Sequence, residues 1–298
     1  MASRNALSDP TTYGEDLPGN LRRVLELAQR HCAGCADYHI RCVAHRAAGE
    51  RFGIDTDRGA LVAVVEELAG RGLSRQSRLD IVIAGSADTG VLATVAHAVA
   101  RLGDEALQRC HFTVLDLCPT PLLLCEHFAG EHGLDFSSAA VDLTAQAKKF
   151  PADIIVMHSV FRFIDRNVQP AVLGELGSWL KPGGSLVFSN RIKSESREEA
   201  EAERAIRSAR NERFAAVTAR GELDVADDRE AIMARLDRWQ HDHESRAGEF
   251  STVDDLKKLL ENASLPLTRF DEIEWAVGGD GRPYHMRKRV IAVLTSAL

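Results

Sequence analysis

The sequence predicts an α/β chain whose core is a mostly parallel β-sheet. Short apolar runs alternate with stretches of helical periodicity between Leu79 and Ser189, which is the pattern of repeated strand–helix–strand units. Two late strands, expected at Leu267–Ala276 and Arg287–Thr295, flank a glycine-rich link and predict an antiparallel hairpin at one edge of the sheet. Because such crossovers are right-handed, the helices should cover both faces of the parallel part.

A helical section is expected to occupy residues 1–77, ahead of the sheet. Asn20 is expected to cap the first helix, because apolar residues follow it at helical spacing. Helical patterns resume through Asp37–Ala48 and Arg58–Ala69.

The remaining residues, 78–298, are expected to form the sheet-containing domain. Buried parallel strands read as short apolar runs bounded by turn residues, and each run here is followed by a helical pattern or a tight turn. The expected strands are Leu79–Ala84, His111–Leu115, Ala139–Val141, Asp153–Met157 and Ser185–Ser189, the expected helices are Thr89–Leu102, Pro119–His132 and Val172–Leu180, and Lys181–Gly184 is expected to be a tight turn.

Residues 193–248 interrupt this alternation. They are rich in Glu, Arg and Ala and carry few apolar anchors, so they predict an inserted pair of surface helices. The alternative is that these helices form a lid over the functional site. A last helix should follow them through Leu260, capped by Ser251 or Thr252.

Composition narrows the class of function. The chain of 298 residues has a net charge of −7 and only 6% aromatic residues, which disfavours nucleic acid and anionic membranes as partners. No apolar stretch behind the first residues resembles a signal peptide, and the 6 cysteines are scattered through helix-like and strand-like stretches. We therefore expect reduced thiols, a cytoplasmic location and a small-molecule substrate; a homodimer stays open.

Small residues follow the first expected strand, and an acidic residue ends the second. The backbone of Gly85, Ser86 and Ala87 can approach a ligand closely, and the carboxylate of Asp116 can accept both hydroxyls of a ribose. Together they favour a nucleoside ligand. The loop lacks the glycine spacing of dinucleotide sites, and Val91 stands where a phosphate-binding loop needs lysine, so adenosine without phosphates is favoured.

At this point the sequence resembles the Rossmann-like (class I) S-adenosylmethionine-dependent methyltransferases. The resemblance implies a seven-stranded sheet with its last strand antiparallel, S-adenosyl-L-methionine as cofactor, and methyl transfer as activity. The segments that carry it are GSADTG at 85–90, VLDLCP at 114–119, AAVDL at 139–143, FPADIIVMHSVF at 150–161 and LKPGGSLVF at 180–188.

The resemblance also assigns cofactor contacts to the strand ends. The glycine loop would pass beneath the methionine part, Asp116 would bind the ribose diol, and Asp142 would face the adenine amino group. The full expected set is Gly85, Ser86, Ala87, Asp116, Leu117, Cys118, Asp142, Leu143, His158 and Ser159.

One position departs from the family pattern. The family often carries an acidic residue two positions before the first glycine of the loop, where it orients the methionine ammonium, and here that position is Ile83. Asp88 or a residue of the helical N-terminal section could take its place. The departure also keeps open a different use of the cofactor, by cyclisation or aminocarboxypropyl transfer. A non-catalytic binding module on this fold is a third alternative.

Substrate contacts are expected on both sides of this site. Tyr38 and Arg41 form a polar stripe that could bind a carboxylate, although a partly exposed helix face explains them equally well. Asn190 and Arg191 follow the fifth strand, and Phe161 follows the fourth. His158 is the candidate general base, needed only if the acceptor must lose a proton.

Cys32, Cys35, His39 and Cys42 have side chains of the types that bind zinc. On one continuous helix with a rise of ~1.5 Å per residue, however, the first and last would lie about 15 Å apart, too far to share an ion bound at ~2.3 Å. We therefore expect buried thiols on a helix face and no metal site.

Overall fold

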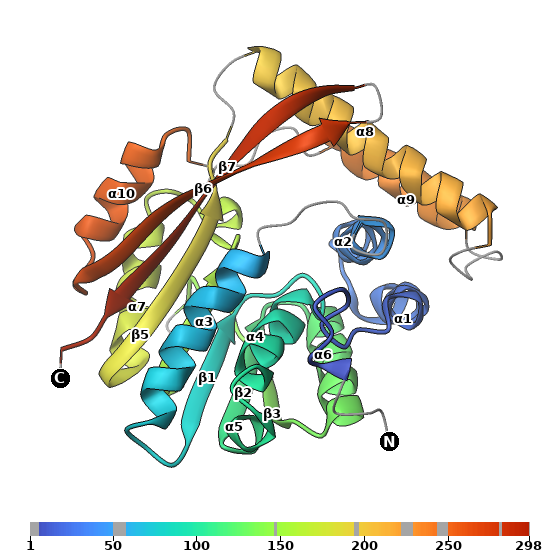
Figure 1. Cartoon of the computed structure of the whole chain (residues 1–298). Coiled ribbons are helices and arrows are strands. Elements are labelled where there is room, and N and C mark those ends of the chain that lie inside the picture. The colour runs from blue at the N-terminus through green and yellow to red at the C-terminus, as the bar shows by residue number, and fades with distance from the viewer. Residues whose placement is uncertain are drawn as a thin grey trace.

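The structure is a computed structural model that describes residues 6–49, 58–145, 148–193, 197–221, 229–242, 250–279 and 282–297. A seven-stranded sheet runs through its centre (Figure 1). The strands are β1 (Leu79–Ala84), β2 (Cys110–Asp116), β3 (Asp135–Ala140), β4 (Ala152–His158), β5 (Leu180–Arg191), β6 (Leu267–Gly279) and β7 (Arg282–Thr295). Their order in the sheet is β3-β2-β1-β4-β5-β7-β6.

The predicted fold class is confirmed. Strands β1 to β5 pair in parallel, whereas β7 runs antiparallel to both β5 and β6 at the sheet edge. Residues 280–281, which belong to the link between β6 and β7, lie outside the described residues.

Helices cover both faces of the sheet. Successive strand residues point to opposite sides, so apolar strands have two apolar faces to bury. Ile81 and Ile83 of β1 belong to the core under α3, α4 and α6, whereas Val82 and Ala84 belong to the core under α7 and α10. These helices are α3 (Arg58–Leu73), α4 (Gly90–Ala100), α6 (Pro119–His132), α7 (Gln169–Trp179) and α10 (Val253–Glu261), and a short α5 (Asp104–Gln108) precedes β2.

The first two helices and the two inserted helices form one further cluster beside α6. They are α1 (Leu17–His31), α2 (Ala36–Gly49), α8 (Arg197–Ala219) and α9 (Arg229–Asp242). Apolar side chains from all of them share a core with Leu124 of α6. Asp37 of α2 also pairs with Arg235 of α9 at 2.7 Å, so the inserted pair is anchored to the N-terminal helices (Figure 1).

The two ends of the insertion lie side by side. Ile192 forms a parallel bridge with Phe250, and the backbone N–H of Lys193 donates to the Phe250 carbonyl at 2.7 Å. The chain therefore leaves the sheet and returns to it at one point, just before α10.

Three expected boundaries need correction. Asp16, not Asn20, caps α1 by accepting from the Gly19 N–H at 3.1 Å, and the Asn20 amide donates to Thr89 at 3.1 Å instead. Strand β3 begins at Asp135, because it pairs with β2 despite its polar composition. The expected turn at Lys181–Gly184 lies inside β5, where Gly183 adopts φ +73° and the register against β4 shifts.

No described helix combines the length and apolar character needed to cross a membrane.

Glu15 lies at the centre of a buried ion-pair network. Its carboxylate accepts hydrogen bonds from Arg46 of α2 and from the Thr89 hydroxyl, and it lies 3.4 Å from Arg58 of α3. Arg46 also donates to Asp88 at 3.0 Å. Burial opposes ionisation of Glu15, but the two guanidinium groups outweigh it and hold its pKa below the ordinary value.

Replacing Glu15 by Gln removes the buried carboxylate that Arg46 and Arg58 share, and Arg46 keeps Asp88 as a counter-charge. We expect Glu15→Gln to lower the free energy of unfolding by roughly 3–5 kcal/mol, measured by urea denaturation at neutral pH. The matched control is Glu105→Gln on the exposed surface of α5, which should stay within about 0.5 kcal/mol of the wild type.

The sign of the pH dependence follows from the lowered pKa. Stabilisation by Glu15 is complete above the unfolded-state value of 4.5 and is lost as the pH falls through the lower folded-state pKa. The difference between wild type and Glu15→Gln should therefore be constant around neutral pH and shrink in acid; an unchanged difference in acid would contradict this.

Candidate functional site

The strand order reverses between β1 and β4, and the loops that follow these two strands touch. Gly85 adopts φ +87°, and a Cβ added there would lie 2.5 Å from a methyl group of Val160. In open α/β sheets, ligands bind outside the carboxyl ends of the strands at such a reversal. The expected glycine loop and the segment after β4 thus lie together at the predicted place.

Asp116 joins the end of β2 to the glycine loop. Its carboxylate accepts from the backbone N–H of Ser86 at 2.9 Å and of Cys118 at 2.8 Å. Burial raises its pKa above the ordinary aspartate value, although these hydrogen bonds oppose the shift. Since a carboxylate has about four acceptor positions, it can still accept from a ligand hydroxyl.

The residues expected around an adenine ring follow the same edge of the sheet. The side chain of Leu117 is 70% exposed, whereas the Cys118 thiol faces Cys32 and Cys35. Beyond β3, Asp142 is fixed by hydrogen bonds from Thr144, which lower its pKa, while the adjacent Leu143 packs on the core. The structure therefore brings the expected adenosine contacts to the ends of neighbouring strands.

The segment after β4 contains a constrained backbone. His158 ends the strand half-buried, and Ser159 adopts φ +61°, which is uncommon for a residue other than glycine. The Ser159 N–H donates to the Ser189 carbonyl at 2.7 Å.

Arg289 of β7 is a residue that the sequence analysis missed. It is 8% exposed and donates to the hydroxyls of Ser159 at 2.7 Å and Ser189 at 3.2 Å. The available signal was a basic residue directly before the apolar run of an expected strand. It places a buried positive charge beside the end of β4.

Asn190 of β5 carries a buried hydrogen-bond acceptor. It is 2% exposed, and its amide nitrogen donates to the Arg191 carbonyl at 2.9 Å. Its side-chain oxygen is buried and has no hydrogen-bond partner among the described residues. An unmet buried acceptor costs free energy unless another group satisfies it.

Aromatic side chains connect α2 to the segment after β4. The Tyr38 ring lies 5.2 Å from the Phe163 ring, and the Arg41 guanidinium lies 5.6 Å from the Tyr38 ring. Burial raises the pKa of Tyr38 well above its ordinary value, so its hydroxyl stays protonated. Phe161, the expected substrate contact, is fully buried against Phe188, and Phe163 is the exposed aromatic residue of this segment.

Asp88, one expected substitute for the acidic residue that the family carries at the position of Ile83, is already engaged by other groups. Ile83 is fully buried in the sheet core. The carboxylate of Asp88 is 4% exposed and engaged by Arg46 and by the Gly90 N–H at 2.8 Å. Asp88 thus fixes the start of α4.

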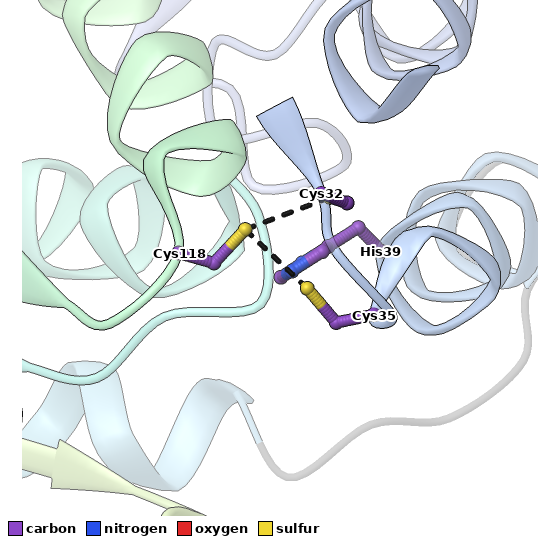
Figure 2. Close-up of side chains that lie close together, drawn as sticks. All are labelled: Cys32, Cys35, His39 and Cys118. Atoms are coloured by element: carbon purple, nitrogen blue, oxygen red, sulfur yellow. Dashed lines mark hydrogen bonds between the residues drawn. The ribbon is translucent and has the colours of Figure 1, made fainter. Parts of the chain in front are cut away.

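The assumption of one continuous helix through the N-terminal cysteines is wrong. Helix α1 ends at His31 and α2 begins at Ala36, so Cys32 and Cys35 lie in the turn between the two helices. This turn brings both cysteines and His39 beside Cys118 (Figure 2). The group differs from the set considered from spacing, since Cys118 takes the place of Cys42.

Solved structures share this architecture. A protein from Bacillus halodurans C-125, assigned provisionally to the methyltransferases, superposes with a TM-score of 0.50 at 13% identity, over 80% of this chain and 99% of that chain. This superposition and the strand order together establish the fold. The chain has the class I S-adenosylmethionine-dependent methyltransferase fold.

Two other methyltransferase structures superpose less closely and add no argument. An O-methyltransferase family protein from Burkholderia thailandensis has 14% identity and a TM-score of 0.47, over 95% of this chain and 69% of that chain. The N-methyltransferase NodS from Bradyrhizobium japonicum, in complex with S-adenosyl-L-homocysteine, has 14% identity and a TM-score of 0.43, over 83% and 90%. No protein-family model and no curated protein sequence matches the chain.

The glycine loop of this methyltransferase fold should not tolerate a side chain at Gly85. Gly85→Ala combines the φ of +87° with the contact to Val160, so we expect it to lower the free energy of unfolding by about 1–3 kcal/mol in urea denaturation. Gly174→Ala is the matched control, because a Cβ there meets nothing within 4 Å on α7, and it should add about 0.5–1 kcal/mol. Equal effects of the two substitutions would contradict the assigned contact.

Proposed function

We propose that this chain binds S-adenosyl-L-methionine at the carboxyl ends of β1 to β4 and transfers its methyl group to a small-molecule acceptor. The observation that carries the proposal is the Asp116 carboxylate, which accepts from the Ser86 N–H while keeping acceptor positions for a ribose. The carboxylate proposed to bind the sugar thus contacts the glycine loop, which lies at the reversal of the strand order.

The surrounding residues fit this cofactor. Gly85 and Ser86 provide a backbone that a methionine moiety could approach, and the exposed Leu117 offers an apolar surface for adenine. The Asp142 carboxylate lies beyond β3, where it could accept from the adenine amino group. We retain Ala87, Cys118, Leu143, His158 and Ser159 as the rest of the cofactor site.

The bound cofactor would supply a methyl group already activated on a sulfonium sulfur. The protein then has to hold an acceptor in line with that group and keep water out, rather than supply strong acid or base chemistry. His158 is the proposed base where the acceptor must lose a proton, because it ends β4, whose following loop meets the glycine loop.

The acceptor is proposed to be small and to carry an anionic group. Arg41 and Tyr38 on α2 and Arg289 on β7 place donors on two sides of the segment after β4. Planar guanidinium groups favour carboxylates and phosphates. Phe163, Asn190 and Arg191 complete this side, with Phe163 taking the contact first expected for Phe161.

The division of the chain is also proposed. Residues 1–77 and the inserted residues 193–248 would close over the acceptor, and residues 78–298 would otherwise hold the cofactor. The six cysteines, all free in this structure, support a reducing cytoplasmic compartment.

Asp116→Asn tests the cofactor site by isothermal titration with S-adenosyl-L-methionine. Loss of the charged contact should weaken binding by about 10–150-fold, or roughly 1.5–3 kcal/mol. Asp104→Asn, an exposed aspartate on α5, is the control and should bind like the wild type. Unchanged affinity in Asp116→Asn would remove this residue from the site.

The reaction is tested with cofactor labelled in its methyl group and a cell extract separated by ultrafiltration. We expect label to enter a compound in the ultrafiltrate as S-adenosyl-L-homocysteine accumulates, and this transfer to fall with Asp116→Asn. Label in the retained macromolecules would contradict a small-molecule acceptor. Methylthioadenosine as product would instead indicate a non-methylating use of the cofactor, and an unchanged cofactor would indicate a binding module.

A further inference from the structure

We infer that Cys32, Cys35, His39 and Cys118 form a zinc site that joins the N-terminal helices to the end of β2. One ligand atom from each of the four side chains lies within 4.8 Å of all the others. Figure 2 shows the side chain of Cys118 facing those of Cys32, Cys35 and His39, which come from a distant part of the sequence.

Two of the distances between sulfurs are close to those around a tetrahedrally coordinated zinc ion. The Cys118 sulfur lies 3.5 Å from that of Cys32 and 3.4 Å from that of Cys35. Zinc–sulfur bonds of ~2.3 Å at tetrahedral angles separate two sulfurs by about 3.8 Å. These two pairs of sulfurs therefore need to move apart by only a few tenths of an ångström to accept the ion.

His39 is oriented as a metal ligand is. Its Nδ1–H donates to the Ala87 carbonyl at 2.7 Å, and the ring is buried. This hydrogen bond leaves Nε2 as the nitrogen with a lone pair for the ion. Histidines that bind metals generally donate their other ring N–H to a carbonyl or carboxylate, which fixes the tautomer and the ring orientation.

The ligand set favours zinc in a structural role. Three thiolates and one imidazole close a tetrahedral coordination shell and leave no open position for a substrate, whereas magnesium and calcium prefer oxygen ligands. A disulfide between Cys118 and either neighbour would explain two of the three thiols. It would not explain the third thiol or the buried imidazole aimed at them.

The four residues come from elements that are otherwise joined by packing and the ion pairs around Glu15. Cys32 and Cys35 lie in the turn between α1 and α2, whose Ala33 and Gly34 are exposed, and His39 lies on α2. Cys118 directly precedes α6. An ion here would fix this turn against the sheet, a task that its small exposed residues cannot perform by burial.

The first test is the metal content of the full-length chain, purified under reducing conditions. We expect about one zinc ion per chain by inductively coupled plasma mass spectrometry. That zinc should be released when the thiols are modified with a mercurial. Replacement by cobalt should give the thiolate charge-transfer and tetrahedral ligand-field absorption bands. These measurements use the wild-type protein, so they do not depend on whether a variant folds.

Single substitutions then identify the ligands. Cys35→Ser, Cys118→Ser and His39→Ala should each lose most of the bound zinc and the cobalt spectrum. Cys42→Ser is the matched control: Cys42 follows His39 on the same helix but is not among the four, so it should keep one zinc per chain.

Three results would overturn the site. The first is a wild-type chain that contains no zinc and does not take up cobalt. The second is full retention of zinc by Cys118→Ser. The third is a mass two hydrogens lower under non-reducing conditions, with a disulfide mapped to Cys118, which would make these residues a redox pair instead. None of these results depends on binding of S-adenosyl-L-methionine.

Discussion

The buried carboxylate of Glu15 determines how the N-terminal helices meet the glycine loop. It binds Arg46 of α2 and Arg58 of α3. It also accepts from the hydroxyl of Thr89, the residue that directly precedes α4. Each of these charges would be costly to bury alone, so the network is stable only when all its members are in place. The position of α2, and with it the side of the proposed site that carries Tyr38, therefore follows from this one carboxylate.

Most of the fold could be predicted because its signals are local. The apolar runs at β1 and β4 and the proline-led start of α6 fix these elements within a residue or so of their observed bounds. The edge strand β3 was harder, because Asp135 and its serines carry no apolar pattern. Only pairing with β2 makes this segment a strand.

The candidate site also has one part that could be predicted from the sequence and another that could not. Asp116 and the glycine loop could be predicted because parallel strands end at one edge of the sheet. The contacts of Arg289 with Ser159, of Tyr38 with Phe163, and of Cys118 with Cys32 join segments far apart in the sequence. Spacing along the chain carries no information on such meetings. The same limit made Cys42 look like a partner of Cys32, whereas Cys118, from beyond β2, lies beside it.

The bridge between Ile192 and Phe250 has a consequence for the diversification of this architecture. Since the inserted segment leaves and rejoins the sheet at a single point, helices of other lengths could be accommodated there without shifting β5 or α10. The proposed nucleoside-binding edge would be inherited unchanged while the inserted helices, proposed to cover it, are exchanged. Chemistry and recognition could then evolve as separable modules within one polypeptide.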